Sequence, residues 1–161
     1  MSDLLAVIGT EAIQSRAFAQ LVTLFEKLNH RRLTDRKVHS WCACGVVSKE
    51  FGSPQHIVQD ALSGASLAII GTWVGANRTS PDSATLLLER CLREPLGRVA
   101  RDIDGAFALM FVDPRTQTVS IATDIVGSLH LFFSKIPGGT AVCTSARALA
   151  ALGTGTLDPL A

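Results

Sequence analysis

Hydrophobic residues recur along this chain with two different spacings, and each spacing predicts a type of secondary structure. Residues 3–9 form a short, nearly continuous apolar run, which is typical of a buried strand. Residues 12–28 place an apolar side chain at every third or fourth position, which predicts an amphipathic helix. Residues 30–37 are mostly basic and polar, so we expect a solvated connector there.

The middle of the chain predicts two further strands, over residues 38–47 and 67–74, joined by a stretch rich in Gly, Ser and Pro. The segment Ser80-Pro81-Asp82 is a favourable helix start. Serine caps the helix, proline suits the first helical position, and the acidic side chain interacts with the positive end of the helix. This helix should end before the next proline in the sequence.

The second half of the chain predicts mostly strands. A short helical turn over residues 96–101 precedes them, and a short helix over residues 146–152 follows them. Two Pro-containing turns divide the strands into hairpins, and the four predicted strands are residues 106–112, 118–123, 129–134 and 140–144. Strands grouped in this way, with helices outside them, predict a layered α+β fold rather than a doubly wound parallel sheet.

The composition excludes several classes of protein. A chain of 161 residues fits one domain, and a content of 47% hydrophobic and 18% charged residues excludes an intrinsically disordered chain. Fifteen basic and fourteen acidic residues leave a net charge of +1, which disfavours a nucleic-acid partner. No run of about eighteen apolar residues is present, so we expect no membrane span. The first strand lacks a basic flank, so it does not resemble a secretory signal, and we expect a cytoplasmic protein.

Cysteine and histidine do not form a recognisable metal site in the sequence. Only Cys42 and Cys44 are close together, whereas a zinc ribbon needs two close pairs. We therefore expect the four cysteines to be reduced and mostly buried thiols rather than two disulfides or metal ligands. The four histidines are scattered and include no pair at helical spacing.

Several short motifs occur in a fixed order and together carry a family resemblance. They are residues 81–87 (PDSATLL), 104–109 (DGAFAL), 122–127 (ATDIVG), 131–133 (LFF) and 143–149 (CTSARAL). This order resembles the glutaminase-type domain of asparagine synthetases, which belongs to the class II glutamine amidotransferases. The segment GTWVGANR at residues 71–78 is also similar to a segment of β-lactam synthetases and lasso-peptide cyclases.

The resemblance implies a fold and a domain organisation. The expected fold is a four-layer αββα sandwich of the N-terminal-nucleophile (Ntn) hydrolase type, with two stacked, mainly antiparallel sheets flanked by helices. Residues 1–152 would form the glutaminase-like domain, and residues 153–161 would be a linker towards a synthetase domain that this chain lacks. In the family, an N-terminal Cys attacks the glutamine side-chain amide, and its own α-amine serves as the base.

Matching the family's site residues to this chain leaves few of them in place. Ser2 stands where the nucleophilic Cys should be, and Ile70, Gly71 and Thr72 replace the Asn-Gly-Glu segment that supplies the oxyanion Asn. Asp82 stands at the position of the acid that binds the substrate amine, although it also suits a helix start. The Arg that binds the substrate carboxylate has no clear match.

The resemblance therefore implies a catalytically degenerate domain that is inactive alone and serves as a scaffold within an asparagine-synthetase-like ligase. The expected partner is a C-terminal synthetase domain or a separate synthetase subunit, and a homodimer stays open. No cofactor is expected in this chain, because ATP and Mg²⁺ are implied only for the synthetase domain. Two alternatives also stay open: an active amidohydrolase with Ser2 as its nucleophile, and a stand-alone binding or assembly module.

Overall fold

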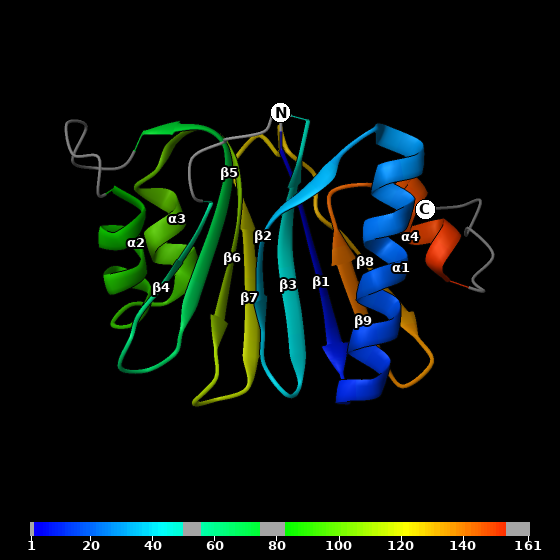
Figure 1. Ribbon diagram of the computed structural model, residues 1–161. Helices are drawn as coiled ribbons and strands as arrows, with labels where there is room; N and C mark the ends of the chain where they lie inside the picture. Colours follow the sequence, from blue (N-terminus) through cyan, green and yellow to red (C-terminus); the bar gives the residue numbers. More distant parts are fainter. Residues whose placement is uncertain (1, 50–55, 75–82, 154–161) are drawn as a thin grey trace.

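The computed structural model describes residues 2–49, 56–74 and 83–153, which form two antiparallel sheets and four helices (Figure 1). The first sheet has the spatial order β2 (Arg32–Val38), β3 (Cys42–Ser48), β1 (Asp3–Gly9), β9 (Gly139–Cys143) and β8 (Phe132–Ile136). The second sheet has the order β4 (Ile57–Gln59), β5 (Ser66–Val74), β6 (Asp104–Asp113) and β7 (Thr118–Thr123). The helices are α1 (Glu11–Asn29), α2 (Ser83–Cys91), α3 (Leu96–Arg101) and α4 (Ala146–Leu152). The expected α+β class with antiparallel sheets is thus confirmed.

Strand β1 lies in the middle of the first sheet and is buried on both faces. Because successive side chains of a strand point to opposite faces, Leu4 and Ala6 join a core between the two sheets. Leu5 and Val7 instead join a second core beneath α1 and α4. The continuous apolar run of β1 therefore reflects burial on two sides rather than one-sided amphipathicity.

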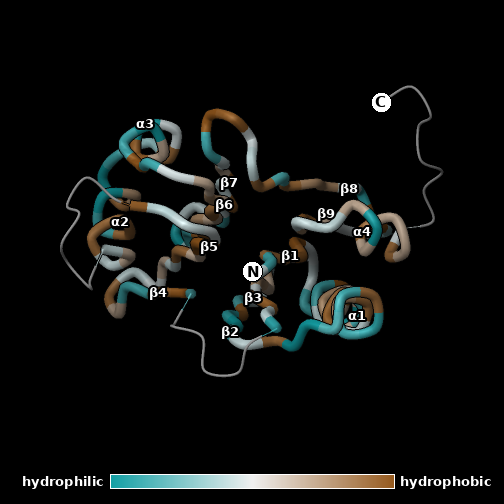
Figure 2. Tube along the Cα trace, turned by 90° about the horizontal axis from the view of Figure 1, so that it is seen from above, coloured by the Kyte–Doolittle hydropathy of each residue, from teal (hydrophilic) through white to brown (hydrophobic). Residues whose placement is uncertain are grey.

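The second sheet is covered in the same way. Strand β6 sends Ala108, Met110 and Val112 into the core between the sheets. Its alternate residues Phe107 and Leu109 pack instead in a third core, which includes residues of α2 and α3. The two sheets thus pack against each other, and each has a pair of helices on its outer side (Figures 1 and 2).

The prediction of a solvated connector over residues 30–37 is wrong. Strand β2 occupies Arg32–Val38 and pairs with β3 at the edge of the first sheet. Its residues alternate between exposed and half-buried, and Leu33 packs against the core beneath α1. Charged side chains on the exposed face are common in edge strands, because they discourage pairing with another chain.

Two other predicted strands are shifted for identifiable reasons. The strand predicted over residues 38–47 begins only at Cys42, because His39 and Cys42 close a turn by exchanging backbone hydrogen bonds of 2.7 and 3.4 Å. The strand predicted over residues 129–134 begins at Phe132, since Leu129 and Leu131 pack against the core between the sheets from a loop. The first misplacement thus comes from a turn between two strands, and the second from apolar loop residues that pack in the core without being part of a strand.

The remaining predicted elements are largely confirmed. The strands over residues 3–9 and 67–74, the hairpins of the second half and all four helices are present, within a few residues at their ends. Short strand β4, like β2, was not predicted from the sequence. The helix start at Ser80-Pro81-Asp82 lies outside the described residues, as does the predicted linker beyond residue 153.

Leu21 provides a direct test of the core beneath α1, because its side chain is fully buried there. We expect Leu21→Ala to lower the free energy of unfolding by about 2–5 kcal/mol, measured by chemical denaturation. Leu62 is 98% exposed, so the matched change Leu62→Ala should alter stability by less than about 0.5 kcal/mol. Equal effects of the two substitutions would contradict this core assignment.

Candidate functional site

Ser2 directly precedes the central strand β1, at the end of the two sheets where the amino terminus lies (Figure 1). Its side chain is half-buried rather than free in solvent. The Ser2 hydroxyl oxygen lies 3.3 Å from Nε2 of His56, a hydrogen-bonded contact between residues 54 positions apart. The structure therefore places the predicted candidate nucleophile beside an imidazole that the sequence did not connect with it.

His56 is fixed by the second sheet. It stands immediately before β4, the edge strand of that sheet, and its carbonyl oxygen accepts a 3.1 Å hydrogen bond from the Ile69 amide in β5. Because Ser2 belongs to the first sheet and His56 to the second, their contact joins the two sheets at one end. We call this place the Ser2–His56 junction.

Asp35 on β2 forms a second link between the sheets beside this junction. Its Oδ2 accepts a 3.0 Å hydrogen bond from the Ile57 amide, and its Oδ1 accepts one of 2.9 Å from the Arg36 amide. The pairing of β2 with β3 shifts register between Leu33 and Asp35, so Thr34 forms a β-bulge. Bulges bend a strand and redirect its side chains, and they are common beside functional sites.

The residue after Ser2 is anchored by an ion pair. Asp3 Oδ2 lies 2.6 Å from Nε of Arg31, and both side chains are largely buried. The Thr144 hydroxyl donates a 2.8 Å hydrogen bond to Asp3 Oδ1. Since Asp3 is held from two sides, the start of β1 is fixed directly beside Ser2.

Burial controls the protonation of His56. Desolvation lowers the pKa of the imidazole below its ordinary value of 6.5, and the nearby Asp35 carboxylate partly opposes this effect. The imidazole is therefore mostly neutral near pH 7. A neutral imidazole can accept a proton, which is the property required of a general base.

Among the other positions that the family resemblance singled out, Ile70 directly follows Ile69, whose amide binds the His56 carbonyl, but its side chain has no polar atom. Ile70, which the resemblance matches to the family's oxyanion Asn, is buried in the apolar core between the sheets. Asp82 lies outside the described residues. Gly71 has a φ of +107°, and a Cβ there would lie 2.1 Å from the Ala106 carbonyl oxygen, so this position requires glycine for backbone reasons.

The four cysteines are all buried and unpaired, which confirms the expectation of buried free thiols. Burial raises the pKa of Cys42 to about 12 and that of Cys44, Cys91 and Cys143 to about 11. A thiol is nucleophilic only as the thiolate. None of these cysteines can therefore replace the N-terminal thiol that Ser2 lacks.

Asp124 organises a loop between β7 and β8. Its carboxylate accepts hydrogen bonds from the amides of Phe107 (3.3 Å), Val126 (3.1 Å) and Ser128 (3.0 Å), and from the Ser128 hydroxyl (3.0 Å). Asp124 is buried, whereas Ile125 is 100% exposed and Val126 is 84% exposed. Figure 2 shows this hydrophobic segment projecting away from the sheets. We call Ile125 and Val126 the apolar loop surface.

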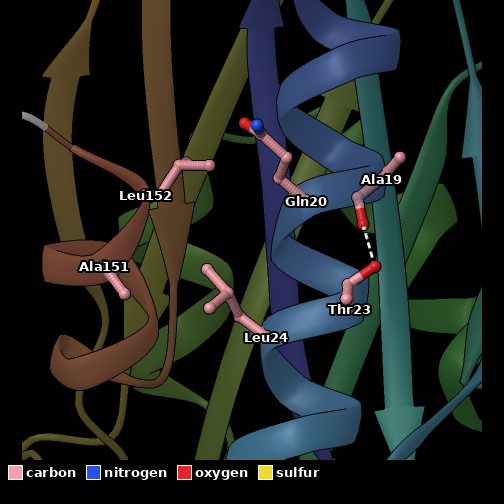
Figure 3. A pocket seen from close by; sticks show the side chains of 6 residues that line it. All are labelled: Ala19, Gln20, Thr23, Leu24, Ala151 and Leu152. Carbon is pink, nitrogen blue, oxygen red and sulfur yellow. Dashed lines mark hydrogen bonds between the residues drawn. The ribbon is translucent and has the colours of Figure 1, made fainter.

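A groove lies between α1 and α4 (Figure 3). It has a volume of about 370 Å³ and is lined by Ala19, Gln20, Thr23, Leu24, Ala151 and Leu152. The Thr23 hydroxyl donates a 3.0 Å hydrogen bond to the Ala19 carbonyl oxygen. No titratable side chain lines the groove, so it offers no acid or base for catalysis.

Comparisons with known proteins do not extend this description. The chain matches no model of a known protein family, and no curated protein matches it significantly. Among the described residues, no three His, Cys, Asp or Glu side chains gather as a metal-binding group. None of the described helices has both the length and the apolar character needed to cross a bilayer.

The buried thiols predict slow chemical modification. At pH 8, Ellman's reagent should react with less than one thiol per folded chain within minutes, because burial blocks access and the raised pKa values leave little thiolate. After denaturation all four thiols should react. A thiol in the folded chain that reacted at the rate of free cysteine would contradict this assignment.

The hydrogen bonds to Asp124 predict a pH dependence of stability. Donors from Ser128, Phe107 and Val126 hold the pKa of this carboxyl below its ordinary value of 3.8 in the folded chain. The contribution of the ionised Asp124 carboxylate to the free energy of unfolding is thus present above pH 3.8 and is lost as the pH falls through the folded-state pKa.

Asp124→Asn should therefore lower the melting temperature clearly at pH 7, and the difference from the parent chain should narrow below about pH 4. Glu26→Gln, an exposed change on α1, should have little effect at either pH. A difference between Asp124→Asn and the parent chain that stayed constant across this range would contradict the interpretation.

Proposed function

We propose that this chain is a glutaminase-like domain without glutaminase chemistry, which serves as a scaffold for an ATP-dependent, amide-forming synthetase similar to asparagine synthetase. The proposal includes the finer fold assignment, a four-layer αββα sandwich of the N-terminal-nucleophile type. The observation that carries it is the position of Ser2. This residue directly precedes the central strand of one sheet and occupies the sequence position of the family's nucleophile.

The ordered sequence motifs support the proposal because they fall on neighbouring elements. Residues 104–109 lie in β6, and residues 122–127 end β7 and form the Asp124 loop. The hydrogen bond from the Phe107 amide to Asp124 joins these two motifs. Residues 143–149 end β9 and begin α4. The direct contact between two of these loose motifs adds weight to the resemblance.

The altered site supports the loss of glutaminase chemistry. Ser2 provides a hydroxyl in place of a thiol, and the buried Ile70 side chain cannot donate a hydrogen bond to an oxyanion. Removal of one oxyanion donor typically costs about a hundredfold or more in turnover. Amide bonds are poor acyl donors, so this combined loss favours a scaffold role over glutamine hydrolysis.

The scaffold role needs a docking face, and we assign it to the apolar loop surface. Ile125 and Val126 are almost fully exposed, while the hydrogen bonds to Asp124 hold the loop in one shape. Rigid, exposed apolar residues favour association, because little entropy is lost when a partner covers them. The partner we propose is the synthetase, as a C-terminal domain or a separate subunit. ATP and Mg²⁺ would bind there, and the buried free thiols fit a cytoplasmic location.

The genomic sequence beside the codon for Ala161 identifies the partner to test. We expect an ATP-dependent synthetase to be encoded either directly downstream in the same frame or by an adjacent gene. In co-expression, that synthetase should co-purify with this chain, and the double change Ile125→Asp/Val126→Asp should weaken binding at least about tenfold.

Leu62→Asp is the matched control, because Leu62 is exposed but lies in the loop between β4 and β5. It should leave binding unchanged. The absence of any synthetase sequence at this locus would overturn the proposal. Self-association of this chain through Ile125 and Val126 would favour an assembly module instead.

An amidohydrolase with Ser2 as its nucleophile is the second candidate, and the 3.3 Å contact with His56 favours it. Glutamate release from glutamine by the purified chain, abolished by Ser2→Ala, would support this candidate over the scaffold. No release above that of Ser2→Ala would exclude it.

A further inference from the structure

We propose that Ser2 and His56 form a nucleophile–base pair that accepts an acyl group from an activated ester or thioester. This goes beyond the scaffold role and does not require the synthetase partner. It also differs from the chemistry that the family resemblance implies, because the base is a side chain of the second sheet and not the α-amine of Ser2.

The geometry of the Ser2–His56 junction carries the inference. Nε2 of His56 lies 3.3 Å from the Ser2 hydroxyl oxygen, and nucleophile–base distances in empty sites are often somewhat longer than the ideal. Each residue is attached to a rigid element: Ser2 to β1 through the Asp3–Arg31 ion pair, and His56 to β5 through its backbone. The pair is therefore positioned by both sheets rather than by a flexible loop.

Asp35 completes the arrangement as a positioning residue. The β-bulge at Thr34 precedes Asp35. The Asp35 carboxylate accepts a hydrogen bond from the backbone amide of Ile57, the residue that follows His56. Asp35 thereby fixes the backbone that carries the imidazole. Its negative charge also stabilises the imidazolium that forms when His56 accepts a proton.

The protonation state of His56 suits the role of base. Desolvation lowers the imidazole pKa and the positive amino terminus adds to this effect, whereas Asp35 and a backbone hydrogen bond of Ile69 oppose it. These are the charged and polar groups that act on the ring from the two sheets and the chain start. At pH 7 the imidazole is therefore mostly neutral, and Nε2 can accept the hydroxyl proton.

The reaction balances with these two groups and water. The Ser2 hydroxyl oxygen bonds to the acyl carbon as its proton moves to His56 Nε2. The bond from the acyl carbon to the ester oxygen or thioester sulfur then breaks, and the leaving group takes that proton. Water then attacks the acyl carbon of the acyl-serine as His56 Nε2 takes a proton from it. The bond from the acyl carbon to the Ser2 oxygen breaks, the carboxylic acid leaves, and His56 returns the proton to the Ser2 oxygen.

The substrate class follows from what surrounds the pair. Ile70 is buried and apolar, so no side-chain donor at that position stabilises an oxyanion. Esters and thioesters have better leaving groups than amides and depend less on such a donor. The pair is thus suited to activated acyl groups rather than to the amide of glutamine.

Covalent labelling by a fluorophosphonate probe, with the modified peptide located by mass spectrometry, tests the pair directly. We expect labelling at Ser2 and none in Ser2→Ala, while Ser15→Ala, an exposed change on α1, should behave as the parent chain. His56→Gln should slow labelling at least about tenfold, and the matched change His130→Gln should not. Labelling should persist in a chain that retains Met1. The Ser2 nitrogen is then a peptide amide and cannot serve as a base, whereas the His56 imidazole still can.

The pH profile separates a positioning role of Asp35 from a merely structural one. The labelling rate should rise with pH and level off above a midpoint lower than 6.5, since only the neutral imidazole is a base. Asp35→Asn removes the charge that raises the imidazole pKa, so it should shift this midpoint to lower pH.

Three results would overturn the proposal: no label at Ser2, equal rates in His56→Gln and His130→Gln, or labelling that is lost when Met1 is retained. Thermal melting of each variant shows whether a loss of labelling is caused by unfolding. If His56→Gln does not fold, the midpoint of the pH profile in the parent chain decides the role of the imidazole.

Discussion

Burial of β1 on both of its faces is the constraint on which the rest of this structure depends. Leu4 and Ala6 close the core between the sheets, while Leu5 and Val7 close the core beneath α1 and α4. The strand also pairs with β3 on one side and β9 on the other. A segment held in this way cannot shift by one residue without moving its side chains to the wrong core. The segment from Ser2 into β1 is thereby fixed in space.

The candidate site follows from this fixed start. Ser2 is one residue before β1, so its position is determined by the sheet and by the Asp3–Arg31 ion pair. An edge strand of each sheet supplies or positions the remaining groups: Asp35 lies on β2, and His56 directly precedes β4. The sheets meet through polar contacts at this end, although their shared core is apolar. His56 is half-buried at the end of this apolar core, and the resulting desolvation lowers the pKa of its imidazole.

The sequence predicted most of the fold because most of its elements are governed by local patterns. The apolar run of β1 and the helical spacing of α1 are visible without any tertiary contact. Strand β2 was missed because its stability depends on pairing with β3, and its own residues are mainly charged. Strand β4 has only three residues, too few to show an alternation.

The candidate site was only partly predictable for a different reason. Ser2 was identified from its place at the start of the chain, by resemblance to a family. His56 was not, because 54 residues separate it from Ser2 and no spacing in the sequence connects them. Asp35 reaches the junction only after the bulge at Thr34. Such convergence depends on how two sheets pack, which the pattern along one chain does not specify.

Amide hydrogen exchange under native conditions tests the central role of β1 most directly. The amides of Leu5, Ala6 and Val7 should be among the slowest in the chain and should exchange only through global unfolding, because the strand lies between β3 and β9 under two cores. Amides of the edge strand β8 should exchange faster through local opening. Exchange of the β1 amides at rates similar to those of β8 would contradict the account.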